Sequence, residues 1–304
     1  MLRLIASRLL LIPPTVLGVV TILFIIFKCV PGDEATMVAG ATATQVEINV
    51  VRQQLGLDRP VLVQYGAHIV ELLRGDLGYS PTFRGNPLPR IMERVPATLL
   101  LTATAIVLTI IIGIPAGTAA ASFQHRWPDL AISGGVATLL AVPNFWLGMM
   151  LIAVVSVQLR WLPSLGLTGP DSLIMPSIAL AARLIALVAR LMRGIVIEER
   201  RKDYVRTAHA KGLGTGRIMY RHVLRNALIP IVTVIGLQTG YLLGGSVVIE
   251  RVFAWPGIGD LLLTAVGLRD FTLVQGITVL FVIGFLLVNL LVEVLFRLIN
   301  PRLR

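Results

Sequence analysis

The sequence predicts an all-α polytopic membrane protein with six transmembrane helices. Three observations lead to this fold class: 56% of the 304 residues are hydrophobic, only 14% are charged, and the mean hydropathy is +0.84. A soluble domain carries about 25% charged residues. The deficit of charge indicates that much of the surface faces lipid.

Six apolar stretches are long enough to cross a bilayer, which takes about 20 mostly apolar residues in a helix. They are Leu9–Val30, Ala97–Ser122, Leu130–Val157, Leu173–Ile195, Leu228–Val248 and Leu273–Phe296. Prolines recur inside them, and membrane helices tolerate proline where neighbouring helices satisfy the freed backbone groups. The first stretch is too long for the apolar part of a signal peptide, and no small-residue cleavage site follows it. We therefore expect it to be retained as the first span.

Basic residues predict the orientation of the chain. Lys and Arg precede the first stretch, lie between the second and third, crowd the loop between the fourth and fifth, and close the chain, which has a net charge of +11. With six spans these segments fall on one side, and the positive-inside rule makes that side cytoplasmic. Residues 32–95, on the opposite side, are balanced, with six Arg against seven Asp and Glu. Both termini are then expected in the cytoplasm.

The long segment between the first two spans, residues 32–95, predicts a small external (periplasmic) helical insertion. Thr44 and Glu47 form a capping-box pattern, and Gly56 suits the position after a helix. Pro60 suits the start of a second helix. A gate, a docking surface and simple packing are all open as roles for this segment.

Residues 203–230 predict a short helix, a glycine elbow and a basic helix at the membrane surface. Asp203 can cap a helix through Ala210, Gly212 and two further glycines interrupt it, and Thr215 can start the next helix. Such a segment either binds anionic lipid as an interfacial helix or docks another protein.

A nucleotide-binding loop is not expected in this segment. A Walker A loop ends in Lys and a hydroxyl residue and follows a strand, whereas Lys211 precedes the glycines here and no strand is indicated. If this chain takes part in ATP-driven transport, the ATPase is another polypeptide. Nucleic-acid binding is not expected either, because no basic stretch carries interleaved aromatic residues or a motif spacing for it.

The glycine-elbow segment resembles the EAA loop of ABC importer permeases in its peptide-type form. The matching residues are Tyr204-Val205-Arg206-Thr207-Ala208-His209-Ala210-Lys211-Gly212-Leu213, with His209 where that pattern usually has Arg. Further segments match in the family's order: Leu55–Pro60, Leu73–Gly78, Glu93–Leu99, Pro143–Gly148, Trp161–Pro163, Phe253–Gly259 and Asn300–Arg302. Nearly the whole chain thus resembles the inner-membrane permease subunits of peptide/nickel ABC importers.

The resemblance implies a type I ABC importer permease fold, in three parts. Residues 1–31 would form the cytoplasmic N-terminus and first span, residues 32–95 the external segment, and residues 96–304 a five-helix permease core with a cytoplasmic EAA coupling loop at about 196–228. It also implies half of a translocation pathway for di- or oligopeptides in the inner membrane. The same machinery importing nickel, glutathione or another small solute remains an alternative.

The resemblance implies partners as well. They are a second homologous permease, two cytoplasmic ATP-binding subunits that hold ATP and Mg, an extracytoplasmic substrate-binding protein and membrane lipid. No cofactor, metal site or catalytic role is expected on this chain. The ATPase-coupling residues would be Tyr204, Arg206, Thr207, Ala208, His209, Ala210, Lys211 and Gly212.

Arg183, near the middle of the fourth span, is the candidate for the translocation path. A charge that faces lipid there costs at least about 2.5–3.5 kcal/mol, so the side chain is expected to face a pore or a partner helix. It would either meet a substrate carboxylate or make a structural contact to backbone carbonyls. Arg190 and Arg193 lie nearer the cytoplasm and are expected to snorkel.

Two hypotheses from other classes compete with an importer subunit. A stand-alone secondary transporter or channel usually shows internal repeats and intramembrane acidic relays, and neither is evident in this sequence. A scaffold that only tethers an ATPase to the membrane is the other.

Overall fold

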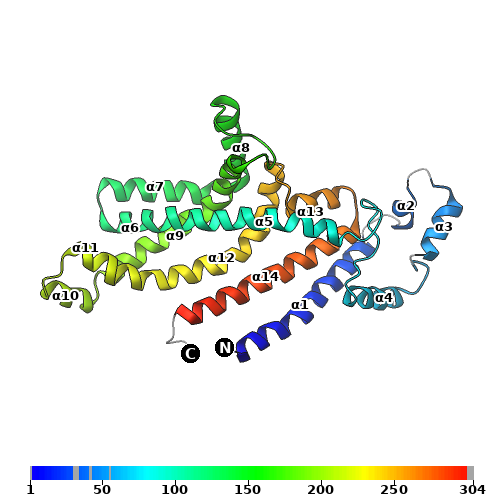
Figure 1. Ribbon diagram of the computed structural model, residues 1–304, viewed down its shortest axis with the longest axis horizontal. Coiled ribbons are helices and arrows are strands. Elements are labelled where there is room, and N and C mark those ends of the chain that lie inside the picture. The colour runs from blue at the N-terminus through cyan, green and yellow to red at the C-terminus, as the bar shows by residue number, and fades with distance from the viewer. Residues whose placement is uncertain (1, 30–33, 41–42, 55, 300–304) are drawn as a thin grey trace. The chain divides into compact units, whose positions relative to one another are not determined.

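The computed structural model describes residues 2–29, 34–40, 43–54 and 56–299, and its regular structure is helical apart from one isolated β-bridge between Ser80 and Gly85 (Figure 1). The α-helices are α1 Leu2–Cys29, α2 Glu34–Ala39, α3 Gln45–Gln54, α4 Val61–Leu73, α5 Leu88–Leu108, α6 Ile114–Ser122, α7 Trp127–Ala141, α8 Asn144–Leu151, α9 Ile174–Glu199, α10 Asp203–Ala210, α11 Thr215–Ile218, α12 Leu224–Val252, α13 Ile258–Gly267 and α14 Phe271–Ile299. Short π-helical turns at Thr109–Gly113, Ile152–Gln158 and Met219–Val223 and a 3₁₀ turn at Pro170–Leu173 extend them.

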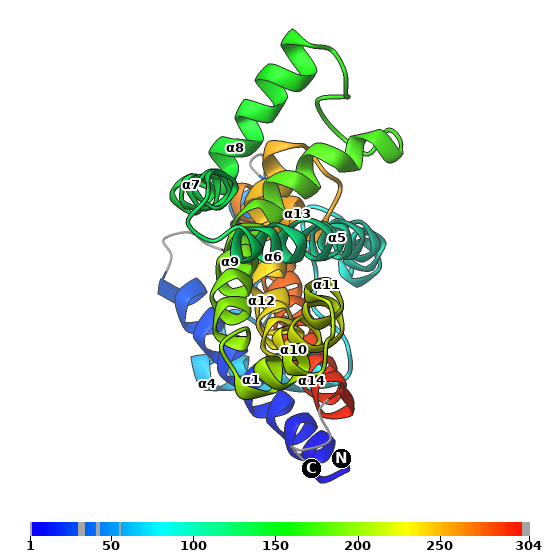
Figure 2. The same ribbon diagram turned by 90° about the vertical axis from the view of Figure 1, so that its left-hand side faces the viewer.

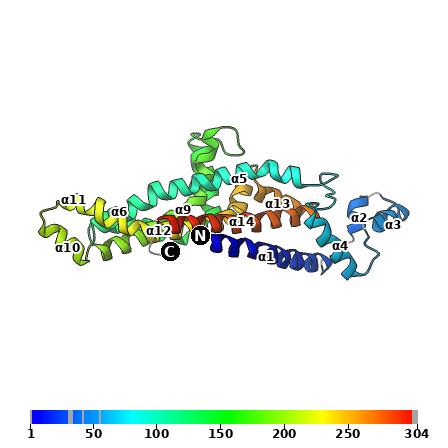
Figure 3. The same cartoon turned by 60° about the horizontal axis from the view of Figure 1, so that its bottom comes forward.

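The predicted helical membrane fold is confirmed. Within the described residues, five helical stretches are long and apolar enough to cross a bilayer, and a bent pair of helices makes six if it counts as one span. The five are Ile5–Cys29, Leu88–Ser122, Pro170–Glu199, Thr215–Val252 and Phe271–Val294. The second begins before Ala97, and Figure 3 shows its two parts, α5 and α6, following one another as a long helix.

The stretch predicted as the third span is not one continuous helix. It consists of Trp127–Ala141 and Asn144–Gln158, which meet at an angle of 105°, and Figure 2 shows α8 leaving the direction of α7. Val142 is extended, with φ −83° and ψ 128°, and Pro143 follows it. A proline clashes with a helical residue before it and offers no backbone N–H, so the helix ends there.

Packing divides the chain into two compact units. The first contains Pro96–Asp260 and the chain from Phe285 onward, and the second contains Leu2–Val95 and Leu261–Gly284.

Helix α9 is the centre of the first unit. Its apolar residues form the largest share of the buried core, and α6, α7, α8 and α12 pack around it. Gly113 and Gly117 bring α6 close to it: a Cβ at Gly117 would overlap the Ala189 carbonyl, and one at Gly113 would lie 3.1 Å from the Ile185 carbonyl oxygen. Small residues four apart allow such close backbone contact between membrane helices.

A buried carboxylate organises the turn between α12 and α13. Glu250 is fully buried and accepts hydrogen bonds from the Thr98 hydroxyl at 2.7 Å and from the backbone N–H groups of Gly259 at 2.7 Å and Asp260 at 3.1 Å. A Cβ at Gly257 would overlap this carboxylate. A Cβ at Gly259 would first overlap the Val247 backbone, so the carboxylate of Glu250 and this backbone together explain the two glycines of the Phe253–Gly259 motif.

The second unit confirms the predicted capping signals. The Thr44 N–H donates to the Glu47 carboxylate at 2.7 Å, and the Glu47 N–H donates to the Thr44 hydroxyl at 3.4 Å, which together form a capping box before α3. Gly56 follows this helix at φ +64°, and Pro60 precedes α4. The short helix α2 has no counterpart among the sequence predictions.

Candidate functional site

The connection between α9 and α12 contains the predicted coupling residues and forms a helical hairpin beyond the ends of these two helices (Figure 1). Helix α10 spans Asp203–Ala210, as the sequence predicted, but its N-cap position is occupied by Lys202, whose side chain makes no cap hydrogen bond. Asp203 is instead the first helical residue. Its carboxylate still stabilises the helix, because a negative charge in the first turn interacts favourably with the helix dipole.

Helix α10 ends in a Schellman motif at Gly212. The Gly212 N–H donates to the His209 carbonyl at 2.9 Å, and the Leu213 N–H donates to the Ala208 carbonyl at 3.2 Å. Gly212 has φ +77°, a conformation that costs a residue with a side chain about 1–2 kcal/mol. The other two glycines of the elbow have no such φ, so Gly212 is the one that the turn requires.

The predicted coupling residues divide between two faces of this hairpin. Of these residues Ala208 points into the core of the unit, where it is 7% exposed, beside Val205, which was not among the predicted residues and is 6% exposed. The outer face carries six of the eight predicted residues, all exposed: Arg206, Thr207, His209, Ala210, Lys211 and Gly212. The hairpin therefore presents a solvent-facing helix that is flanked by Lys202 and Lys211 and held from behind by apolar contacts.

Tyr204 ties α10 to the ends of both neighbouring helices. Its hydroxyl donates to the Glu199 carboxylate at the end of α9 at 2.6 Å and accepts a hydrogen bond from Asn226 of α12. Lys202 also donates to Glu199, which raises the pKa of its ammonium group. Burial raises the pKa of Tyr204, and its hydrogen bond to Glu199 raises it further. The phenol therefore stays protonated and keeps donating at neutral pH.

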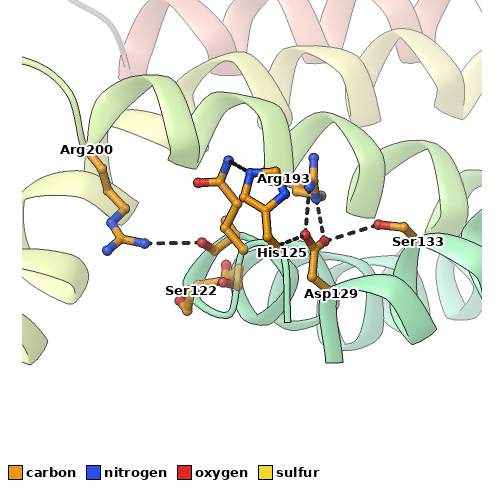
Figure 4. Close-up of polar contacts among 9 residues, drawn as sticks. Ser122, His125, Asp129, Ser133, Arg193 and Arg200 are labelled. Atoms are coloured by element: carbon orange, nitrogen blue, oxygen red, sulfur yellow. Dashed lines mark hydrogen bonds and ion pairs between the residues drawn. The ribbon is translucent and has the colours of Figure 1, made fainter. Parts of the chain in front are cut away.

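A second polar cluster joins the turn between α6 and α7 to α9 (Figure 4). The Asp129 carboxylate accepts from Arg193 Nε at 2.6 Å and Nη2 at 2.7 Å, from the His125 backbone N–H at 3.0 Å and from the Ser133 hydroxyl at 3.2 Å. Asp129 is only 2% exposed. This ion pair fixes the guanidinium of Arg193 and was not among the sequence predictions.

Arg200, the residue after Glu199, connects the same two regions. Its guanidinium donates to the Ala121 carbonyl near the end of α6 at 3.1 Å. A cation near the C-terminus of a helix satisfies free carbonyls and interacts favourably with the helix dipole. The start of the coupling hairpin is thus fixed against α6 as well as α12.

Sequence reasoning did not identify Asp129 or Glu199. Asp129 follows Pro128 at the start of a helix, which is a helix-start signal and not a site signal. Its partner lies 64 residues away, and one sequence carries no trace of that pairing.

Arg183 lines a groove of about 640 Å³ on the α9 side of the first unit. Asn144, Gln238 and Tyr241 supply the other polar side chains of its wall, and leucines supply most of the rest. Arg183 is exposed and makes no hydrogen bond or ion pair among the described residues. The backbone-carbonyl contact considered for it is therefore not seen within those residues.

Metal binding finds no support in the geometry. Within the described ranges, no three side chains of His, Cys, Asp and Glu lie together in a way that could hold an ion.

Two family profiles cover nearly the whole chain. Residues 113–304 match the "binding-protein-dependent transport system inner membrane component", and residues 1–102 match the N-terminal part of the same kind of membrane component. The chain belongs to this family. It is accordingly a non-catalytic, multi-pass inner-membrane permease of the ABC importer class, as the resemblance implied.

Individual relatives agree with this assignment. The chain is 42% identical over 304 residues to the glutathione transport system permease protein GsiC of Salmonella choleraesuis strain SC-B67, covering 100% of this chain and 99% of the relative. It is also 42% identical over 309 residues to GsiC of Escherichia coli strain K12, with the same coverage. These identities support membership in the peptide/nickel branch of the family.

Solved structures share the fold of this permease. A subunit of the inward-facing MetNI methionine ABC transporter superposes with a TM-score of 0.58 at 20% identity over 69% of this chain and 96% of its own. An amino acid ABC transporter gives a TM-score of 0.56 at 17% identity, over 69% and 94%. The predicted type I importer permease fold is confirmed.

Proposed function

We propose that this permease forms half of the translocation pathway of an ATP-driven importer and that α10 docks on a separate ATPase subunit. The observation that carries the proposal is the hairpin itself: an exposed short helix flanked by two lysines, closed by a Schellman turn and tied through Tyr204 to the ends of α9 and α12. A short helix fixed in this way transmits a push to two spans without bending. A flexible loop would absorb it.

The remaining partners follow from the family. They are a second permease of the same kind, two ATPase subunits that bind ATP and Mg, and an external binding protein that delivers the solute. The basic hairpin lies on the cytoplasmic side in this proposal, because positive loops remain inside. Both termini then lie inside as well.

The proposed cargo is a short peptide, with glutathione the first to be tried. The relatives named above are glutathione permeases, and the match covers 100% of this chain and 99% of each relative. Other di- and oligopeptides, nickel and further small solutes are outcomes that the transport assay separates.

The test is reconstitution of the complete transporter, with its second permease, ATPases and binding protein, in proteoliposomes. ATP-dependent uptake of glutathione or a dipeptide is expected, and it should stop when the ATPase cannot hydrolyse ATP. Uptake that continues without hydrolysis would instead support a secondary transporter or channel. ATPase binding without any uptake would support a scaffold.

Docking is tested by Arg206→Glu on the exposed face of α10. This charge reversal is expected to reduce co-purification of the ATPase with the permease. Arg160→Glu, an exposed arginine in the connection between α8 and α9, is the matched control and should leave co-purification unchanged. Equal co-purification of both variants with the wild-type permease would rule out docking on this face.

A further inference from the structure

Two grooves lie next to each other along α9 in the first unit. The larger, of about 640 Å³, contains Arg183, and the smaller, of about 410 Å³, contains Arg190 and Arg193. Leu140 of α7 lines both grooves, so they adjoin there. The two grooves together are called the α9 groove below.

Arg183 and Arg190 face the same way along this groove. They are seven residues apart, which is about two helical turns and about 10 Å along the axis. Both side chains are exposed, and within the described part of the chain neither has an ion-pair partner. Arg193 differs from them, because Asp129 neutralises it.

The wall of the α9 groove contains no acidic residue among its described lining. Its other polar groups are the amides of Asn144 and Gln238, the phenol of Tyr241 and the hydroxyl of Ser133. These groups can hydrogen-bond a solute but supply no negative charge. The groove therefore offers two unneutralised cations in an otherwise neutral wall.

The position of Arg183 within a spanning helix requires water or an anion beside it. A guanidinium that faces hydrocarbon is costly, and charged residues inside membrane spans mark solute and ion pathways. A carboxylate suits this partner, because an arginine binds it through two parallel hydrogen bonds.

We propose that the α9 groove binds the transported solute and selects one with a carboxylate at each end. The proposal rests on the importer function above and names the solute class for that path. An extended chain of three residues spans at most about 10–11 Å, which matches the spacing of the two arginines. The solute is thus tripeptide-sized and carries two carboxylates.

The charge pattern of the solute is the discriminating feature. An ordinary tripeptide has a carboxylate at only one end, so its ammonium end would meet an arginine without a carboxylate to bind it. In glutathione the γ-linked glutamate places an α-carboxylate beside its α-ammonium group at one end, and glycine places a second carboxylate at the other. Glutathione therefore brings one carboxylate to each of the two arginines.

The experiment uses the complete reconstituted transporter and three probes: glutathione, glutathione amidated at the glycine carboxylate, and glutathione amidated at both carboxylates. Arg183→Gln and Arg190→Gln are compared with Arg160→Gln, an exposed arginine outside both the groove and the coupling hairpin. ATP-dependent uptake and ATP hydrolysis are both recorded. Binding of each probe to the isolated binding protein is measured in parallel. A preference of the binding protein can then be separated from a preference of the permease.

Each arginine variant is expected to raise the KM for glutathione at least tenfold and to raise that for the doubly amidated probe much less. Arg160→Gln should behave as wild type with all probes. An equal loss for all three probes would mean a structural role and would overturn the proposal. Unchanged glutathione uptake would also overturn the proposal. Loss of the second permease from the purified complex would overturn it as well, because it would mean that the arginines pair with that subunit.

Failure of the importer function would look different. The wild-type transporter would then take up none of the three probes in an ATP-dependent manner. Phospholipid that co-purifies with wild type but not with Arg183→Gln, without a change in the KM for glutathione, would assign the groove to a lipid headgroup and would also overturn the proposal.

Discussion

Asp129 of α7 and Arg193 of α9 form a bidentate ion pair, with the carboxylate oxygens 2.6 and 2.7 Å from Nε and Nη2 of the guanidinium. The Asp129 side chain is 3% exposed and that of Arg193 is 31% exposed. The pair joins the turn between α6 and α7 to the helix that leads into the coupling hairpin. It fixes the base from which the hairpin projects.

Asp129→Asn should destabilise the permease, because it leaves a half-buried guanidinium without its counter-charge. Removing one partner of a buried pair costs about 3–5 kcal/mol, and the partial exposure of Arg193 reduces this to about 1–3 kcal/mol. The free energy of unfolding in detergent measures the change. Glu93→Gln, which breaks the exposed pair of Glu93 with Arg90, is the control and should cost less than about 1 kcal/mol.

The double variant Asp129→Asn with Arg193→Gln separates pairing from packing. It should recover part of the loss, since the unpaired charge is gone. If the two single losses simply add, the pair is not the source of the stability.

Gly212→Pro should uncouple transport from ATP hydrolysis. Proline cannot adopt φ +77° and has no N–H to donate to the His209 carbonyl, so the Schellman turn cannot form. Uptake per ATP hydrolysed is expected to fall at least about tenfold, while the complex still assembles. The uptake per ATP of Gly212→Ala should lie between those of the wild type and Gly212→Pro. Open space surrounds the position, so the variant has only the backbone strain of about 1–2 kcal/mol.

Gly216→Ala is the matched control for the elbow. A Cβ added to this glycine would meet no neighbour within 4 Å, and the residue lies in α11 at an ordinary helical conformation. Normal coupling is expected from it. Normal coupling from Gly212→Pro as well would remove the elbow from the mechanism.

Gly117→Ala should weaken the contact between α6 and α9, because the added Cβ would overlap the Ala189 carbonyl. Overpacking of this kind costs about 1–3 kcal/mol. Gly134→Ala on α7 meets nothing within 4 Å and should be neutral or stabilising by about 0.5–1 kcal/mol. Thermal unfolding of the two purified variants makes the comparison, and equal midpoints would contradict the close packing at Gly117.

The proposed orientation predicts which side of the membrane each loop occupies. In a Cys29→Ser background, a cysteine at Asp58 should react with a membrane-impermeant maleimide added to intact spheroplasts. A cysteine at Lys211 should react only after the membrane is opened. Labelling of Lys211→Cys from outside the spheroplasts would contradict the proposed orientation.

Signals confined to a few neighbouring residues predicted much of this fold. Hydropathy located the spans, because lipid requires about 20 apolar residues wherever a helix crosses it. The capping box at Thr44 and the left-handed turn at Gly212 were also readable, since each depends on hydrogen bonds within one turn of helix. The family motifs added the coupling segment.

The prolines show what such local signals do not predict, which is whether a helix continues or ends at a given proline. Pro96 and Pro230 lie inside continuous helices, whereas the chain bends by 105° at Pro143. All three lack a backbone N–H. Whether the helix continues depends on what neighbouring helices offer to the freed carbonyl groups, and these neighbours are distant in the sequence.

The sequence by itself determined that this protein is a helical membrane permease with a basic coupling segment, because composition, hydropathy and short motifs are properties of the chain. Only the tertiary structure decided that Arg193 is neutralised by Asp129 while Arg183 and Arg190 line a groove without acidic residues. Three arginines of one helix look alike in a sequence. Their roles differ because packing brings a carboxylate from 64 residues away to one of them and leaves the other two facing open space.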